Sequence, residues 1–174
     1  METTQQLIAA LTTALEMEKQ SFDFYTKAAK ISTSALGKKT FKSLARDEKL
    51  HSVALREFSK GIQKKQKTPL LSAVIPARQK GKFLFGRSQA EMLKGVTPGS
   101  DEFKAYEIAM KLENDGYAFY KKSYDETEDL ALKELFAFLL SEEKRHYELV
   151  SSSFAYLKDP AGWFTREEKP IVEG

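Results

Sequence analysis

Four glutamates stand at positions where a helical core pattern calls for apolar side chains. In four segments the apolar residues recur at alternating spacings of three and four, which is the period of a helix with one buried face. Each apolar stripe is interrupted once by a glutamate, at Glu18, Glu48, Glu113 and Glu143. Because a buried carboxylate is costly unless a partner compensates its charge, the fold must bring such partners to all four positions.

The second half of this pattern repeats the first at a distance of 95 residues. The shift relates three pairs of polar residues, namely Glu18 and Glu113, Glu48 and Glu143, and His51 and His146. It also relates apolar positions on the same stripes, such as Leu15 and Met110. We interpret the repeat as a duplicated helical hairpin whose two copies pack about a pseudo-two-fold axis.

Interruptions of the helical pattern give the order of the elements. Short breaks at about 31–37 and 125–128 separate segments that must be antiparallel neighbours, because a short connection brings consecutive helices side by side. We therefore predict an all-α protein, an antiparallel four-helix bundle in one domain covering 1–174. Its parts are a first hairpin at about 4–60, a long crossover at about 61–100, a second hairpin at about 101–157 and an irregular tail at 158–174. In the tail, Trp163 and Phe164 are expected to fold back on the bundle.

The crossover is the most basic part of the chain. Between residues 61 and 99, eight lysines and arginines accompany a single acidic residue, Glu91. Prolines and glycines interrupt any long helix here, although Ser88 and Glu91 have the spacing of a capping box and predict one short helix. Such a segment can dock a small acidic electron-transfer protein, or it can be a solvated loop. No nucleic-acid-binding motif accompanies it, so nucleic acid is not an expected partner.

Composition excludes several kinds of metal site. The 174 residues include no cysteine, which rules out disulfides, thiolate zinc sites, iron–sulfur clusters and rubredoxin-type iron. The amino-terminal residues are amphipathic and lack the basic region of a secretory signal. No stretch approaches the roughly 20 apolar residues of a membrane span, so cytoplasmic residence is the default expectation.

Two Glu-x-x-His pairs place a carboxylate and an imidazole on one helical face. Residues three apart on a helix are neighbours, so Glu48 with His51, and Glu143 with His146, can each chelate one ion. Each of the four stripe glutamates lies fifteen residues from the centre of its turn, which is about 22 Å along a helix. The six side chains are therefore predicted to converge at one height in the bundle.

Charge decides what this layer must contain. Four buried carboxylates repel one another and lose their hydration, whereas two divalent cations would balance their charge. One Glu from each of two helices and a Glu-x-x-His pair from each of the other two is a ligand set that holds two metal ions in helical bundles. Oxygen-rich ligation with one imidazole per ion favours iron or manganese over zinc or copper. Two iron ions are the expected cofactor, manganese or a mixed pair is the alternative, and zinc can enter recombinant protein.

Two tyrosines follow the same stripes. Tyr25 and Tyr120 each lie seven residues after the single glutamate of their helix, which is two turns along the same face. They can hydrogen-bond to the ligand carboxylates or carry electrons near an oxidised centre. They can equally be core aromatic residues whose hydroxyls find other partners.

Four stretches resemble the rubrerythrin branch of the ferritin-like superfamily. They are EKQSFDFY from Glu18 to Tyr25, DEKLH from Asp47 to His51, ENDGYAFY from Glu113 to Tyr120, and EEKRH from Glu142 to His146. The resemblance implies a ferritin-like bundle with a di-iron centre. It further implies that Glu48 and Glu143 bridge the two ions, that Glu18 and Glu113 are terminal ligands, and that His51 and His146 bind one ion each.

The same resemblance implies an activity, with two departures from the family pattern. The chain has no cysteine for a rubredoxin domain, so electrons must come from another protein. Relatives commonly carry a further glutamate three residues after the third-helix ligand, where this chain has Gly116. The expected function is a di-iron oxidoreductase that reacts with hydrogen peroxide or dioxygen. The alternatives are a non-catalytic protein that sequesters iron, and a structural bundle without metal. A homodimer is expected, in which hairpins could be exchanged between subunits.

Overall fold

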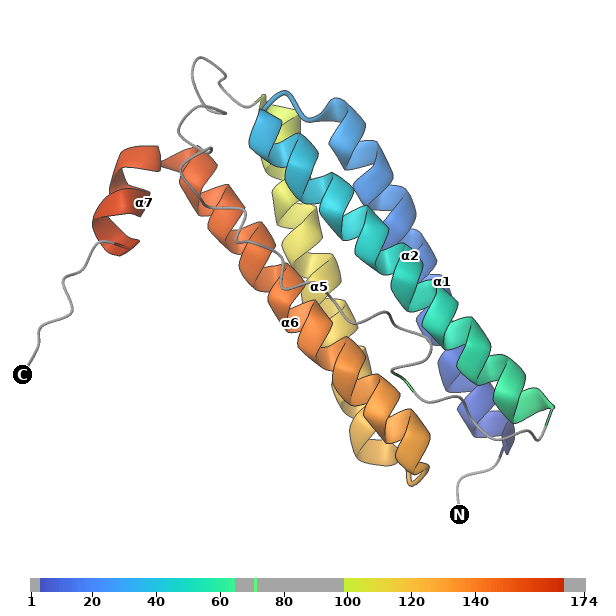
Figure 1. The fold of residues 1–174 in the computed structure, drawn as a ribbon. Coiled ribbons are helices and arrows are strands. Elements are labelled where there is room, and N and C mark those ends of the chain that lie inside the picture. The colour runs from blue at the N-terminus through green and yellow to red at the C-terminus, as the bar shows by residue number, and fades with distance from the viewer. Residues whose placement is uncertain (1–3, 65–70, 72–98, 168–174) are drawn as a thin grey trace, which may run out of the picture.

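The chain folds into long helices (Figure 1). The structure is a computed structural model, and it describes residues 4–64, 71 and 99–167. The helices are α1 (Thr4–Ile31), α2 (Ala35–Gln63), α5 (Ser100–Glu126), α6 (Leu130–Lys158) and the short α7 (Pro160–Glu167). The described part of the chain contains no strand, so the all-α prediction is confirmed. Within those same residues no helix is both long and apolar enough to cross a membrane.

Two helical hairpins lie side by side in the bundle. Helix α1 packs along α2 and helix α5 along α6, while α1 also contacts α5 and α2 contacts α6. The predicted bundle of two hairpins is therefore confirmed. The short helix expected near Ser88 and Glu91, and the basic residues from 65 to 98, lie outside the described residues.

Each hairpin turn ends with a side chain that caps the following helix. The Ser34 hydroxyl accepts a hydrogen bond of 2.8 Å from the backbone N–H of Gly37 at the start of α2. The Asp129 carboxylate accepts one of 2.9 Å from the backbone N–H of Leu132 at the start of α6. Both caps satisfy backbone donors that the first turn of a helix leaves free, which explains why the helices restart at these residues.

A buried glutamate joins the second hairpin to the turn of the first. Glu102, in the first turn of α5, is 1% exposed. Its carboxylate accepts hydrogen bonds from the backbone N–H and the hydroxyl of Thr33, at 2.8 and 2.9 Å. It also accepts bonds from the backbone N–H of Ser34, at 3.1 Å, and from the Ser34 hydroxyl. Gly37 leaves room for this contact, because a Cβ atom there would lie 2.0 Å from Glu102 Oε1.

The hydrophobic core consists of two clusters with a polar layer between them. The cluster near the α1–α2 turn includes Phe41 and Tyr106, and the cluster towards the opposite end includes Leu55 and Phe136. The stripe glutamates and the histidines fall between these clusters along α1, α2, α5 and α6. The apolar clusters thus hold the four helices together and exclude water on either side of the layer.

The tail differs from the expectation of an irregular segment. Helix α7 covers Pro160–Glu167, and Trp163 packs against Tyr156 with ring centroids 5.5 Å apart. Proline suits the first position of a helix, and the Asp159 carboxylate accepts a 2.9 Å hydrogen bond from the backbone N–H of Gly162. The sequence pattern did not reveal this start signal because Asp159 and Pro160 directly follow the end of α6. The Phe164 side chain and residues 168–174 lie outside the described parts.

Candidate metal centre

The six predicted side chains meet between the two core clusters. All of them are buried, with no more than 5% of any residue exposed. Helices α1 and α5 each contribute one glutamate, and helices α2 and α6 each contribute a glutamate and a histidine. They are Glu18, Glu48, His51, Glu113, Glu143 and His146. The structure therefore brings the six together, while metal binding by them stays a prediction.

Their ligand atoms form two groups of the size that one ion can bind. One group contains Glu18, Glu48, His51 and Glu143, and its ligand atoms all lie within 4.8 Å of one another. The second contains Glu48, Glu113 and His146, within the same distance. Glu48 belongs to both groups, so its carboxylate lies between them.

Both imidazoles present Nδ1 to the carboxylates. His51 Nδ1 lies 3.2 Å from Glu18 Oε2 and 3.6 Å from Glu48 Oε2. His146 Nδ1 lies 3.2 Å from Glu48 Oε1 and 3.4 Å from Glu113 Oε2. The two rings stack with centroids 5.5 Å apart and an interplanar angle of 22°. Each histidine thus directs the same nitrogen into the layer, as the repeat predicts.

The two tyrosines hydrogen-bond across the hairpins. The Tyr25 hydroxyl in α1 donates to Glu113 Oε1 in α5, and the Tyr120 hydroxyl in α5 donates to Glu18 Oε1 in α1. Burial and the nearby carboxylate charges raise the pKa of both hydroxyls, which keeps them protonated as donors. Of the two functions considered for these residues, the hydrogen-bonding one is present, and electron transfer stays a prediction.

Burial and crowding shift the pKa values of the carboxyls in opposite directions. Burial, followed by the charge of Glu48, raises the pKa of Glu18 to about 8. The same two causes raise the pKa of Glu143 well above its usual value. Burial would also raise the pKa of Glu48, but close polar contacts with Glu18, His146 and His51 outweigh it and hold that pKa well below the usual range. Glu48 therefore keeps its charge while Glu18 and Glu143 tend to bind protons.

The histidines hold protons for a related reason. Burial alone would lower the pKa of both imidazoles, but the charge of Glu18 raises that of His51 and the charge of Glu113 raises that of His146. Protons on the carboxyls and imidazoles thus supply positive charge in the absence of metal. This behaviour supports the argument that the layer needs compensating cations.

Several buried atoms in the layer are suited to a metal ion. Among the described residues, Glu48 Oε1, Glu113 Oε2 and His146 Nδ1 make no hydrogen bond. Buried polar atoms are nearly always hydrogen-bonded, so these atoms require another partner. Carboxylate oxygens and imidazole nitrogens are ligands of iron and manganese, and the donor set fits such an ion.

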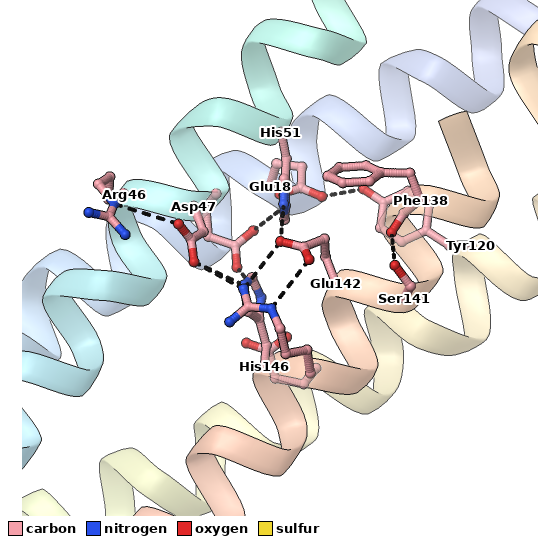
Figure 2. A network of polar contacts seen from close by, with 12 residues as sticks. Glu18, Arg46, Asp47, His51, Tyr120, Phe138, Ser141, Glu142 and His146 are labelled. Atoms are coloured by element: carbon pink, nitrogen blue, oxygen red, sulfur yellow. Dashed lines mark hydrogen bonds and ion pairs between the residues drawn. The ribbon is translucent and has the colours of Figure 1, made fainter. Parts of the chain in front are cut away.

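Two further carboxylates, which the sequence analysis missed, lie behind the histidines. Asp47 Oδ2 is 3.6 Å from His146 Nε2, and Glu142 Oε2 is 3.6 Å from His51 Nε2 (Figure 2). Each carboxylate therefore contacts the histidine of the other hairpin. Carboxylates in this position orient a metal-binding imidazole and fix which nitrogen faces the ion. The repeat could have revealed these two residues, because the 95-residue shift relates Asp47 to Glu142, and both are acidic.

A small cavity reaches the layer between α1 and α5. Its volume is about 120 Å³, and its walls include Met17, Gln20, Ser21 and Gly116. Glu18, Glu48, Glu143 and Tyr120 also line it, so the cavity gives access to the carboxylates from the side opposite the outer carboxylates Asp47 and Glu142. The 95-residue shift relates Ser21 to Gly116, so equivalent positions of the two hairpins line the cavity.

Gly116 also determines where Glu143 can lie. A Cβ atom at residue 116 would be 2.9 Å from Glu143 Oε2 and 3.1 Å from Glu143 Cδ. The Glu143 carboxylate therefore occupies the space into which a side chain at 116 would extend. A glutamate there would displace Glu143 from its present position.

Comparison with known proteins agrees with these observations. The sequence model of the rubrerythrin family matches residues 3–153, a range that contains all six side chains of the layer. Searches of curated proteins and of solved structures found no match. A match over most of the chain shows its family, and the chain belongs to the rubrerythrin family.

Proposed function

We propose that this protein is a di-iron carboxylate oxidoreductase that reduces hydrogen peroxide or dioxygen with electrons from a separate carrier. The buried layer of four glutamates and two histidines, divided into two groups that share Glu48, carries this proposal. Glu18, Glu48, His51 and Glu143 would hold one ion, and Glu48, Glu113 and His146 would hold the other. Iron is the better candidate because the ligands are mainly carboxylates with one imidazole for each ion.

The chemistry requires electrons, protons and a site that excludes bulk water. Reduction of one hydrogen peroxide to two water molecules consumes two electrons and two protons. Two bound iron ions would supply Lewis acidity and one electron each, and the separate carrier would return those electrons. Tyr25 and Tyr120 hold the terminal carboxylates through hydrogen bonds, and the two core clusters keep water away on either side.

The cavity restricts the substrate to a small molecule. A volume of about 120 Å³ holds several water molecules and has room for peroxide or dioxygen. Polar side chains, among them Gln20, Ser21 and Asp115, line it together with the layer glutamates. These dimensions favour a hydrophilic oxidant over a bulky organic substrate.

The electron donor is the least constrained part of the proposal. A chain without cysteine cannot carry a rubredoxin site, so we propose a cytoplasmic carrier protein as the donor. The excess of positive charge between residues 61 and 99 favours an acidic carrier that docks there. Increasing ionic strength would then slow reduction by the carrier, because salt screens the attraction.

Reaction with the oxidant tests the proposal. Protein loaded with ferrous ion under anaerobic conditions is mixed with one equivalent of hydrogen peroxide, and the iron absorption spectrum is followed in time. We expect oxidation far faster than that of free ferrous ion under the same conditions, followed by further turnover when a reductant is supplied. Oxidation no faster than in the protein-free control would contradict the proposal.

Gly116 favours a second candidate, a protein that binds and releases iron without sustained turnover. The glutamate that relatives carry at this position is absent, and Glu143 fills its space. A sequestering protein would show reversible loading and at most one oxidation event for each loading. Continuous consumption of reductant and peroxide distinguishes the enzyme from this alternative.

A further inference from the structure

One arginine contacts both carboxylates that lie behind the histidines. Arg145 Nη2 lies 3.1 Å from Asp47 Oδ2 and 3.2 Å from Glu142 Oε2. A third contact of 3.3 Å joins Arg145 Nε to Glu142 Oε1. A single guanidinium therefore joins α2 to α6 on the outer side of the layer.

The oxygens that Arg145 holds are the ones that face the imidazoles. Asp47 Oδ2 is also the atom 3.6 Å from His146 Nε2, and Glu142 Oε2 is the atom 3.6 Å from His51 Nε2. Asp47 is 4% exposed and Glu142 is 9% exposed, so both carboxylates have lost most of their water. Asp47 Oδ2 and Glu142 Oε2 both lie against Arg145 Nη2, so these two buried carboxylates would repel each other more strongly if the guanidinium were removed.

Arg145 breaks the symmetry of the repeat. The 95-residue shift relates it to Leu50, which lies on α2 with 41% of its surface exposed. The repeat thus provides a pair of histidines and a pair of outer carboxylates, and among the described residues the Arg145 guanidinium contacts both carboxylates. The planar, fork-shaped guanidinium can donate to both carboxylates at once.

We propose that Arg145 is a positioning residue that holds Asp47 and Glu142 against the Nε2 atoms of His146 and His51, and so fixes Nδ1 of both rings towards the metal layer. Through Asp47 and Glu142, Arg145 orients each imidazole from its Nε2 side. The carboxylates of the layer orient the same rings from the Nδ1 side. This proposal rests on the proposed function in one respect, which is that the Nδ1 atoms bind metal ions. The orientation of the rings can be measured without metal.

A metal ion at this outer position is the competing interpretation. His51, Glu142 and His146 also offer ligand atoms within 4.8 Å of one another. The positive charge that an ion would bring is already provided by Arg145, whose Nη2 lies 3.2 Å from Glu142 Oε2. The geometry therefore favours a guanidinium at the outer side and metal ions at the inner side.

Exchange of the ring N–H protons tests the orientation directly. The chain has only two histidines, so protein labelled with ¹⁵N-histidine gives one Nε2–H signal for each ring. In metal-free protein we expect Arg145→Leu to increase the exchange rate of both signals at least about tenfold, because both carboxylates lose their restraint. Asp47→Asn should affect mainly His146, Glu142→Gln mainly His51, and Arg145→Lys should preserve part of the protection.

Arg46→Leu is the matched control. Arg46 Nε lies 3.6 Å from Asp47 Oδ1, and its side chain is 71% exposed. The control removes the same charge beside the same carboxylate but leaves the Arg145 contacts intact. We expect the Nε2–H protons of this control to exchange at the same rates as those of the unmodified protein. Equal exchange rates in the unmodified and Arg145→Leu proteins, or an equal increase in the Arg46→Leu control, would overturn the proposal.

Cobalt binding separates this proposal from the proposed function. If the unmodified protein binds Co²⁺, we expect Arg145→Leu to weaken the affinity about 10–100-fold, with the helical circular dichroism unchanged. Affinities within about twofold of each other would overturn the positioning role even though the metal centre stands. If no form of the protein binds Co²⁺ while the variants still show the exchange pattern, the metal centre fails and the positioning role stands.

Discussion

Individual side chains in the layer are placed so that protons and metal ions compete for them. Burial raises the pKa of Glu18 to about 8, and the pKa values of Glu143, His51 and His146 are raised as well. A group whose pKa is raised on folding stabilises the fold while it is protonated and loses that contribution as the pH rises through the folded-state value. Metal-free and metal-loaded protein should therefore respond to pH in different ways.

We predict that the metal-free protein becomes less stable as the pH rises from about 4.5 to about 8. Over this window the unfolded chain releases the Glu18 proton while the folded protein keeps it, and Glu48, whose pKa is lowered, stays charged throughout. The loss should be on the order of a few kcal/mol, because each pKa unit corresponds to about 1.4 kcal/mol. Thermal melts in a chelator measure it, and Glu18→Gln should flatten the dependence. A stability that rises across this window would contradict the assignment of the protons.

A second prediction separates stability from metal binding at Gly116. Gly116→Ala should leave the free energy of unfolding of the metal-free protein unchanged, or raise it by up to about 1 kcal/mol, because alanine favours the helix. It should weaken metal binding, since the new methyl group would lie 2.9 Å from Glu143 Oε2 and must displace that carboxylate. Ser21→Ala, at the position related by the repeat, is the control and should bind metal normally. Unchanged metal affinity in Gly116→Ala would show that the position of Glu143 is not critical.

At the scale of helices, a buried carboxylate joins the first turn of α5 to the turn between α1 and α2. Glu102 begins α5 and accepts hydrogen bonds from Thr33 and Ser34 in the α1–α2 turn. Loss of these bonds leaves buried donors without an acceptor, which costs more than the bonds themselves contribute. We therefore assign Glu102 to the docking of the hairpins.

We predict that Glu102→Gln lowers the free energy of unfolding by about 2 kcal/mol, because an amide offers the turn one acceptor oxygen in place of two. Glu107→Gln, an exposed position on the same helix, should have little effect. Urea denaturation of both variants beside the unmodified protein makes the comparison. Equal stability of the two variants would mean that the turn finds other acceptors.

The helices and the six layer residues could be predicted from the sequence because both follow from periodicity. A spacing of three and four fixes the buried face, and the turn positions fix the height of Glu18, Glu48, Glu113 and Glu143 along the bundle. Contacts between side chains far apart in sequence have no such signal. The Glu102 contact with Thr33 spans 69 residues, and the Arg145 contact with Asp47 spans 98. Helix α7 was missed for a local reason, because its start signal coincides with the end of α6.

At the scale of the whole molecule, one chain supplies a complete layer. The described hairpins α1–α2 and α5–α6 pack against each other and bring all six side chains together. A homodimer remains our prediction, with either intact hairpin pairs or exchanged ones. Complementation between two variants distinguishes these arrangements.

We predict that mixing Glu48→Gln and Glu113→Gln chains under conditions of subunit exchange restores no layer that holds two ions. Each variant carries its change in a different hairpin, so an intrachain layer stays defective in every mixed dimer. If hairpins were exchanged, a mixed dimer would contain one layer built from two unmodified hairpins. More metal bound by the mixture than the average of the two variants measured separately would therefore show that the hairpins are exchanged.

The central claim is that the layer holds two metal ions which share Glu48. The most direct measurement is the number of ions retained per chain after anaerobic loading with ferrous ion and removal of the excess. The structure predicts two ions per chain in the unmodified protein, one in each group of ligands, and a loss of both in Glu48→Gln. Retention of no iron, or of two ions in Glu48→Gln as in the unmodified protein, would contradict the account.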